Sequence, residues 1–261
     1  MAKQLNVRDP EGLNLRFYET YDEKYLLRKA EILLFIAKHA DAFRGFAEQH
    51  EWTPESIDRR ALRAEVHFTE LHQSEAFFAL LTAIFQTKPH WVYLTEYKPG
   101  AMKKKAEAYL KGDIAAVTNG RIDKLNDFLN SAIYDGFIVS DEEKARDWQT
   151  NLDNIDWMIR RIARKYVKGE EYNAYKHGLR FVAEPSFIRF TLTDHPDRGF
   201  EFSSDDSLTF LELTPTEGSV NEGRLSHQSF DPEQSILHLD FMSGVLVVHP
   251  AKRLPFRVAA R

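Results

Sequence analysis

The chain has 261 residues, a formal net charge of −5, 43% hydrophobic and 29% charged residues, and no cysteine. This size and balance allow a substantial core and exclude an extended disordered chain. The missing cysteines exclude a disulfide scaffold, a thiolate zinc site, an iron–sulfur cluster and a cysteine nucleophile. The negative net charge gives no global signal for nucleic-acid binding.

Neither a signal sequence nor a membrane span is expected. Residues 1–8 have no apolar core typical of a secretory signal. The longest apolar run, near residues 32–37, is far too short to cross a bilayer. We therefore expect a cytoplasmic protein without a membrane partner. The sequence has no P-loop and no G-x-G-x-x-G motif, so it gives no reason to expect a cofactor.

The first half of the chain is expected to be helical. Apolar residues recur every three or four positions from Asp22 to about Gln49, which predicts a helix. The motif Thr53-Pro54-Glu55 is typical of a second helix start, because threonine caps, proline suits the first position and glutamate complements the dipole. This helix is expected to run to Thr87, and its second half is apolar on nearly all sides, which predicts deep burial.

Proline and glycine bound the next elements. Pro99 and Gly112 are expected to begin and end one helix. Residues 113–134 are predicted to be helical with a break at Thr118-Asn119-Gly120.

A capping box at Ser140-Asp141-Glu142-Glu143 predicts the start of a long helix that Gly169 ends. A short helical piece from Glu170 to about Gly178 should follow. The apolar stripe of the long helix comprises Trp148, Leu152, Ile155, Ile159, Ile162 and Tyr166.

After residue 180 apolar residues recur at every second position instead of every third or fourth. Three segments alternate in the manner of strands, at 187–193, 208–213 and 236–241. Turn-forming residues are found at 194–199, 203–206 and 215–218. Short turns between strands predict an antiparallel sheet. The predicted fold class is therefore α+β, with an N-terminal helical bundle (1–180) and a β-rich C-terminal region (181–261) whose small antiparallel β-sheet packs on the bundle.

The segment around Asn173, Lys176 and His177 is the main candidate site, because these residues share one face of a helix. Histidine can move protons near neutral pH, lysine can stabilise a phosphate or developing negative charge, and asparagine can orient either group. The alternative is structural, since cations complement a helix C-terminus and Gly178 would cap it.

Four more residues are predicted to bind a phosphate-bearing ligand, namely Tyr172, Arg180, Arg164 and Lys168. On the long helix, a basic strip opposite the apolar stripe comprises Arg161, Arg164, Lys165 and Lys168. Such a strip is usually a solvated face. The alternative is a track for phosphates that leads to His177.

Residues 22–180 resemble the HEPN superfamily, and the specific part of this resemblance is the segment Asn173-x-x-Lys176-His177-Gly178 near the start of a late helix. These bacterial and archaeal helical domains often belong to toxin–antitoxin and phage-defence systems, and many are metal-independent ribonucleases that act as dimers. The resemblance implies catalysis by Asn173, Lys176 and His177. Catalytic members carry an arginine shortly before the histidine, where this chain has Glu170, Glu171 and Tyr172.

Residues 65–75 place two histidines and three carboxylates on one predicted helix. His67 and His72 lie on different sides of a helix and cannot share one metal ion. No second helix supplies the matching motif of a di-iron site, so no metal site is predicted. We interpret the segment as a polar helix face, from which Glu70 or His72 could meet residues 173–177.

Three functions follow from the sequence. The first is a HEPN-like protein that binds or cleaves RNA or binds another phosphate-bearing ligand. The second is a non-catalytic interaction module that forms a homodimer or holds another partner. The third is a metal-dependent or small-molecule enzyme with a site between bundle and sheet.

Overall fold

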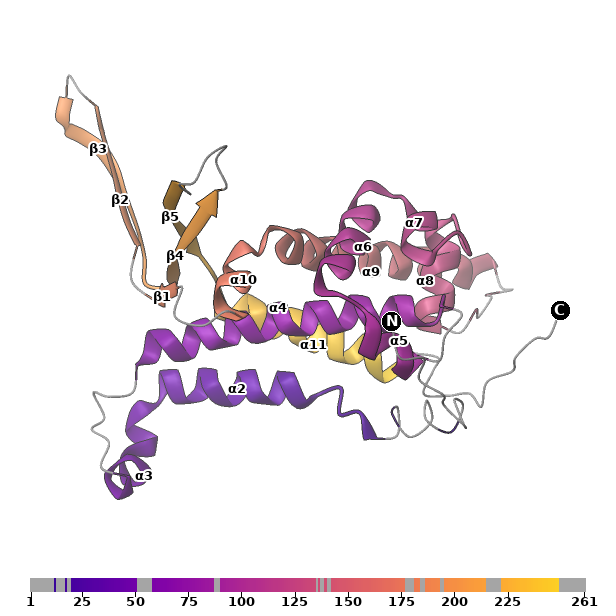
Figure 1. The fold of residues 1–261 in the computed structure, drawn as a ribbon, viewed down its shortest axis with the longest axis horizontal. Helices are drawn as coiled ribbons and strands as arrows, with labels where there is room; N and C mark the ends of the chain where they lie inside the picture. The colour runs from indigo at the N-terminus through magenta and orange to yellow at the C-terminus, as the bar shows by residue number, and fades with distance from the viewer. Residues whose placement is uncertain are drawn as a thin grey trace, which may run out of the picture. The chain divides into compact units, whose positions relative to one another are not determined.

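The computed structural model describes residues 12, 17, 20–50, 58–86, 90–134, 136, 139, 142–176, 181–183, 186–192, 195–214 and 222–248 (Figure 1). The fold is α+β, with a helical N-terminal region followed by small antiparallel sheets, as the sequence predicts. The chain divides into two compact units. The first comprises residues 1–25, 72–168 and 240–261, and the second comprises residues 26–71 and 169–239.

Ten helical segments precede the strands in the described part of the chain. They are α2 (Tyr25–Lys38), the 3-10 helix η1 (Ala40–Phe43), α3 (Arg44–Gln49), α4 (Arg59–Ala83), α5 (His90–Glu96), α6 (Pro99–Lys111), α7 (Ile114–Thr118), α8 (Leu125–Tyr134), α9 (Glu142–Lys168) and α10 (Glu170–Lys176). The helix predicted over residues 22–49 is therefore divided into α2, η1 and α3. Both α4 and the later helix α11 contribute one part to each unit.

Helix α4 begins and ends at positions that differ from the prediction. Its first turn is capped by Asp58, whose Oδ1 accepts the backbone N–H groups of Arg60 and Ala61. The predicted motif at residues 53–55 lies outside the described residues. The helix ends at Ala83 because the N–H of Phe85 donates to the carbonyl of Thr82, a bond that tightens the last turn. Its second half is buried on nearly all sides, as predicted.

The predicted boundaries of α6, the break after α7 and the end of α9 are confirmed, although the break is longer than predicted because α8 begins only at Leu125. Ser140 and Asp141 of the predicted capping box lie outside the described residues. Gly112 adopts a left-handed conformation (φ 76°) after α6, which a residue without a Cβ tolerates. Asn119 (φ 57°) separates α7 from α8 in the same conformation. Helix α9 ends at Lys168, one residue before Gly169.

A buried tyrosine joins α6 to α9 in the first unit. The hydroxyl of Tyr109 donates to Asp156 Oδ1 over 2.7 Å, and Arg160 Nε donates to Asp156 Oδ2 over 2.7 Å. Arg160 also donates to the carbonyl of Leu110. Burial, followed by the hydrogen bond to Asp156, raises the pKa of Tyr109 above its ordinary value. The side chain of Arg160 is therefore held against α6 and does not belong to the exposed basic strip.

The strands form two antiparallel sheets in the second unit. The five described strands are β1 (Phe181–Ala183), β2 (Ser186–Leu192), β3 (His195–Ser204), β4 (Ser207–Thr214) and β5 (Glu222–Ser229). One sheet has the order β1-β4-β5 and the other is the hairpin β2-β3 (Figure 1). The predicted strands at 187–193 and 208–213 are confirmed as β2 and β4. The turn predicted at 194–199 is wrong for residues 195–199, which belong to β3, where His195 and Gly199 pair with β2. Residue 194 and the turn predicted at 215–218 lie outside the described residues.

The strand predicted at 236–241 is also wrong, because these residues belong to helix α11 (Pro232–Val248). Asp231 caps the helix by accepting the N–H of Gln234 at its Oδ1. Pro232 occupies the first helical position, where its missing N–H costs nothing. The buried residues then recur with a helical period, at Ser235, His238, Leu239, Met242, Ser243, Val245 and Leu246.

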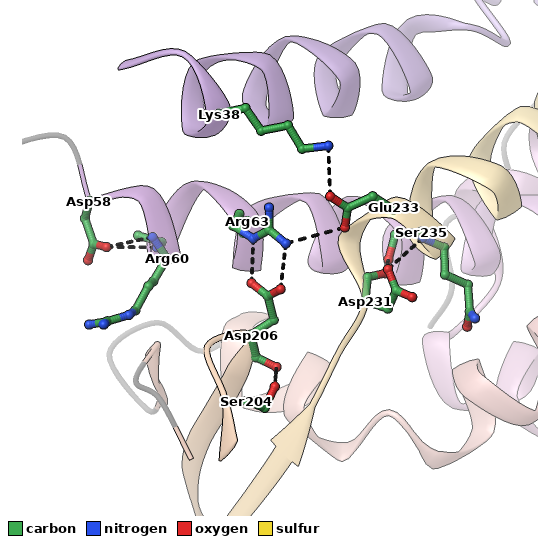
Figure 2. Close-up of polar contacts among 11 residues, drawn as sticks. Lys38, Asp58, Arg60, Arg63, Ser204, Asp206, Asp231, Glu233 and Ser235 are labelled. Carbon is green, nitrogen blue, oxygen red and sulfur yellow. Dashed lines mark hydrogen bonds and ion pairs between the residues drawn. The ribbon is translucent and has the colours of Figure 1, made fainter. Parts of the chain in front are cut away.

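An ionic network holds α2, α4, the β3–β4 turn and α11 together within the second unit. The guanidinium of Arg63 forms a fork with Asp206, with both distances at 2.6 Å, and reaches Glu233 at 3.4 Å. Lys38 Nζ lies 2.9 Å from the other oxygen of Glu233. Figure 2 shows Glu233 between the two cations. The network therefore fixes the first turn of α11 next to the C-terminal end of α2 and the N-terminal part of α4.

The same contacts shift two pKa values. The hydrogen bond to Asp206 raises the pKa of Arg63 above its ordinary value. Burial alone would raise the pKa of Glu233, but the hydrogen bond from Lys38 and the charge of Arg63 outweigh it and lower this pKa. Glu233 therefore stabilises the fold above its unfolded pKa, and this contribution is lost as the pH falls through its folded pKa.

We expect Glu233→Gln to lower the free energy of unfolding at pH 7 by at most about 1 kcal/mol, because the pair is half exposed. The difference from the wild type should vanish on acidification, when the wild-type carboxylate is protonated. Urea unfolding followed by circular dichroism at several pH values measures this. Glu31→Gln, at an exposed position of α2, is the control. A deficit of Glu233→Gln that is equal at neutral and acid pH would contradict the role given to this carboxylate.

Candidate functional site

The predicted catalytic segment begins on α10, which ends at Lys176. The ammonium of Lys176 lies 4.2 Å from the centroid of the Tyr172 ring, and Lys176 is exposed while Tyr172 is buried. Asn173 belongs to the same short helix. His177 and Arg180 lie outside the described residues. The structure therefore brings together Tyr172 and Lys176 of the predicted site, and the placement of His177 stays a prediction.

The aromatic side of α10 packs against α4. The ring of Tyr175 stacks on Phe68 with centroids 4.2 Å apart, and its hydroxyl donates to Glu65 Oε1 over 3.0 Å. Lys29 lies 2.7 Å from the same oxygen. Burial, followed by the nearby charge of Glu65, raises the pKa of Tyr175 to about 12. The tyrosine is therefore a neutral donor near pH 7 that anchors α10 to α4.

A buried histidine–glutamate pair adds a second link between these helices. His67 Nε2 lies 3.1 Å from Glu171 Oε1, and Gln228 of β5 donates to the same oxygen over 2.9 Å. Both His67 and Glu171 are fully buried, and the ring of His67 stacks on Phe230. His67 Nδ1 and Glu171 Oε2 have no hydrogen-bond partner within the described part of the chain.

A second buried pair joins α4 to α11, where His238 Nδ1 lies 2.6 Å from Glu70 Oε1. Glu70 is fully buried and His238 nearly so. The interpretation of residues 65–75 as one polar helix face is therefore wrong, because His67 and Glu70 are buried whereas His72 is exposed. Each side chain has its own partner, because the residues point from one helix toward different neighbours. Glu65 and His67 are the side chains of this segment whose contacts with α10 are described, and a contact of Glu70 or His72 with residues 173–177 stays a prediction.

These pairs are sealed inside the protein and hold elements together. Among the residues that the structure describes, no group of three or more histidine, aspartate or glutamate side chains could hold a metal ion. A buried hydrogen-bonded pair needs both partners, since removal of one leaves a polar group unsatisfied in a medium of low polarity. We assign the two pairs to fixing α4 against α10, β5 and α11 within the second unit.

The exposed basic strip on α9 is the strongest candidate for contact with a ligand. Arg164 and Lys168 are exposed, and Arg161 and Lys165 are half-buried. The opposite side of the helix carries the buried stripe, including Leu152, Ile159, Ile162 and Tyr166. The strip therefore lies opposite the core, as predicted. The sequence from Trp157 to Lys168 contains no acidic residue, and the strip ends on the N-terminal side at Asp153.

Trp157 is a member of this face that the sequence analysis missed. Its side chain is 55% exposed, and Arg161 Cζ lies 5.4 Å from the centroid of its ring. Trp157, Arg161, Arg164 and Lys168 span about 60° around the helix axis. The sequence holds a signal for Trp157, which precedes the three cations by four, seven and eleven residues and lies outside the apolar stripe.

Comparison with known proteins adds no assignment, since no family model, curated protein or solved structure matches this chain. Within the described residues, no helix is both long and apolar enough to cross a membrane. The arguments about function therefore rest on the side chains described above.

We expect His238→Ala to lower the free energy of unfolding by about 1–3 kcal/mol, because it removes the imidazole that lies next to the buried side chain of Glu70. Chemical denaturation monitored by tryptophan fluorescence measures the loss. The double variant Glu70→Leu/His238→Leu should be more stable than His238→Ala, since it removes the buried carboxyl group along with its partner.

Leu237→Ala is the matched control, because the neighbouring side chain is 67% exposed and should change stability by less than about 0.5 kcal/mol. If His238→Ala unfolds at the same denaturant concentration as Leu237→Ala, the buried pair does not hold α11 in place.

Proposed function

We propose that the protein binds a nucleic acid, with RNA as the first candidate, through the exposed basic strip of α9. The observation that supports this most is the alignment of Arg161, Arg164 and Lys168 on one face of α9, whose sequence from Trp157 to Lys168 contains no acidic residue. Arginine and lysine side chains bind phosphate groups, and a row of them can follow a nucleic-acid backbone. The strip is local, since the chain as a whole has a net charge of −5.

We expect Arg164→Gln/Lys168→Gln to weaken binding to a labelled single-stranded oligonucleotide. It should also reduce the slope of log affinity against log salt concentration by about 1.4, because each lost phosphate contact contributes about 0.7. Fluorescence anisotropy over a range of salt concentrations measures both quantities. Neither side chain is buried, so the fold should be retained.

The double variant Arg121→Gln/Lys124→Gln is the control. It makes the same change in net charge at two exposed positions between α7 and α8 of the same unit. If both double variants weaken binding equally, the attraction is a property of overall charge, and α9 is not the contact.

A catalytic function is the second proposal, and the exposed position of Lys176 next to Tyr172 favours it. In it, His177 takes the proton from a ribose 2′-hydroxyl, whose oxygen bonds to the adjacent phosphorus as the bond to the 5′-oxygen breaks, and His177 then gives the proton to that 5′-oxygen. Lys176 stabilises the charge that develops on the phosphate, and Asn173 orients these groups. This scheme follows the HEPN resemblance and needs no metal ion.

We expect the purified protein to cleave RNA in the presence of a chelator, and His177→Ala to abolish the cleavage. Gel analysis of a labelled RNA measures it. An all-deoxy substrate should stay intact because it lacks the attacking hydroxyl, and His72→Ala, at an exposed histidine of α4, should stay active. Cleavage that requires a divalent ion would favour a metal-dependent enzyme. A stable oligomer without any cleavage would favour an interaction module or homodimer.

A further inference from the structure

Trp157 is exposed on a helix that has its core contacts on the other side. Leu152, Ile159 and Ile162 of α9 are buried, whereas more than half of the Trp157 side chain is accessible. A single exposed aromatic residue needs no explanation by itself. Here the exposed indole belongs to the same face as three cations, and this combination indicates a ligand.

Arg161 orders the indole ring. Its guanidinium carbon lies 5.4 Å from the ring centroid, within the range of a cation–π interaction. The arginine comes one helical turn after the tryptophan, so a rigid backbone sets the geometry of the pair. An aromatic ring that is already held in place loses little side-chain entropy when a second flat group stacks on it.

The chemistry of the face selects one kind of occupant. The cations Arg161, Arg164 and Lys168, together with the absence of acidic residues from Trp157 to Lys168, match a polyanion. The indole adds a platform on which a nucleobase can stack, and this combination of aromatic residues and cations is characteristic of single-stranded nucleic-acid binding. The bases of a duplex are already stacked on one another and do not offer a free face.

We infer that Trp157 makes the α9 face selective for single-stranded nucleic acid, with one base stacked on the indole and the adjoining phosphates bound by Arg164 and Lys168. This inference rests on the proposed nucleic-acid binding and deepens it. Recognition by stacking tolerates any base, because every base has a π-face. The α9 face is therefore expected to distinguish single-stranded from double-stranded nucleic acid, and not one base sequence from another.

The test compares four labelled probes of equal length, namely oligo-U, oligo-dT, an abasic deoxyribose-phosphate chain and a duplex. The wild type should bind the two base-bearing single strands about tenfold more tightly than the abasic chain, since stacking on an aromatic side chain contributes about that much. Trp157→Leu should bind all three single-stranded probes alike. Trp157→Phe should retain most of the preference because it keeps an aromatic platform.

A spectroscopic signal provides an independent check. Quenching of tryptophan fluorescence by oligo-dT should be strong in the wild type and should largely disappear in Trp157→Phe, although the other three of the four tryptophans are still present. Equal affinity for the oligo-U and oligo-dT probes supports stacking, and a preference for oligo-U alone would overturn the base-stacking account in favour of a contact with the ribose.

The outcomes separate the two proposals. If the wild type binds the abasic chain as tightly as oligo-dT, or if Trp157→Leu binds like the wild type, the inference about Trp157 is wrong. The proposed function still stands in that case, provided that Arg164→Gln/Lys168→Gln weakens binding and lowers its salt dependence. If that double variant binds like the wild type, both proposals are wrong.

Discussion

A carboxyl group that leaves water needs hydrogen-bonding partners inside the protein, and in the second unit histidines lie next to two buried carboxyl groups. Glu171 is bound by His67 and Gln228, and Glu70 is bound by His238. Hydrophobic contacts tolerate small shifts, whereas a buried pair of this kind requires one particular alignment of its elements. These pairs therefore define how α10, β5 and α11 are arranged against α4.

Charges are also sorted between interior and surface on α9 itself. Arg160 is held by Asp156 against α6, while Arg161, Arg164 and Lys168 stay with Trp157 on the outer face. Sorting of charges between interior and surface thus produces a basic, aromatic strip on a chain whose net charge is negative.

Local signals in the sequence predicted much of the helical region, since Gly112 and the long apolar stripe of α9 act through their own backbone or helix face. Helix α11 was missed because Leu237 and Leu239 alternate with polar residues, although the Asp231-Pro232-Glu233 start is a helix signal. The partner of Glu70 could not be predicted, because pairing with a histidine 168 positions away depends on the whole fold.

The separation between Glu70 and His238 has a consequence for biosynthesis. During translation, residues 65–75 leave the ribosome long before α11 is made. Glu70 can therefore contact His238 only after nearly the whole chain has emerged. Closing so long a loop is slow in comparison with local helix formation. Nascent chains that end before α11 should therefore have an incompletely folded second unit. Such chains should be the species that chaperones and proteases bind.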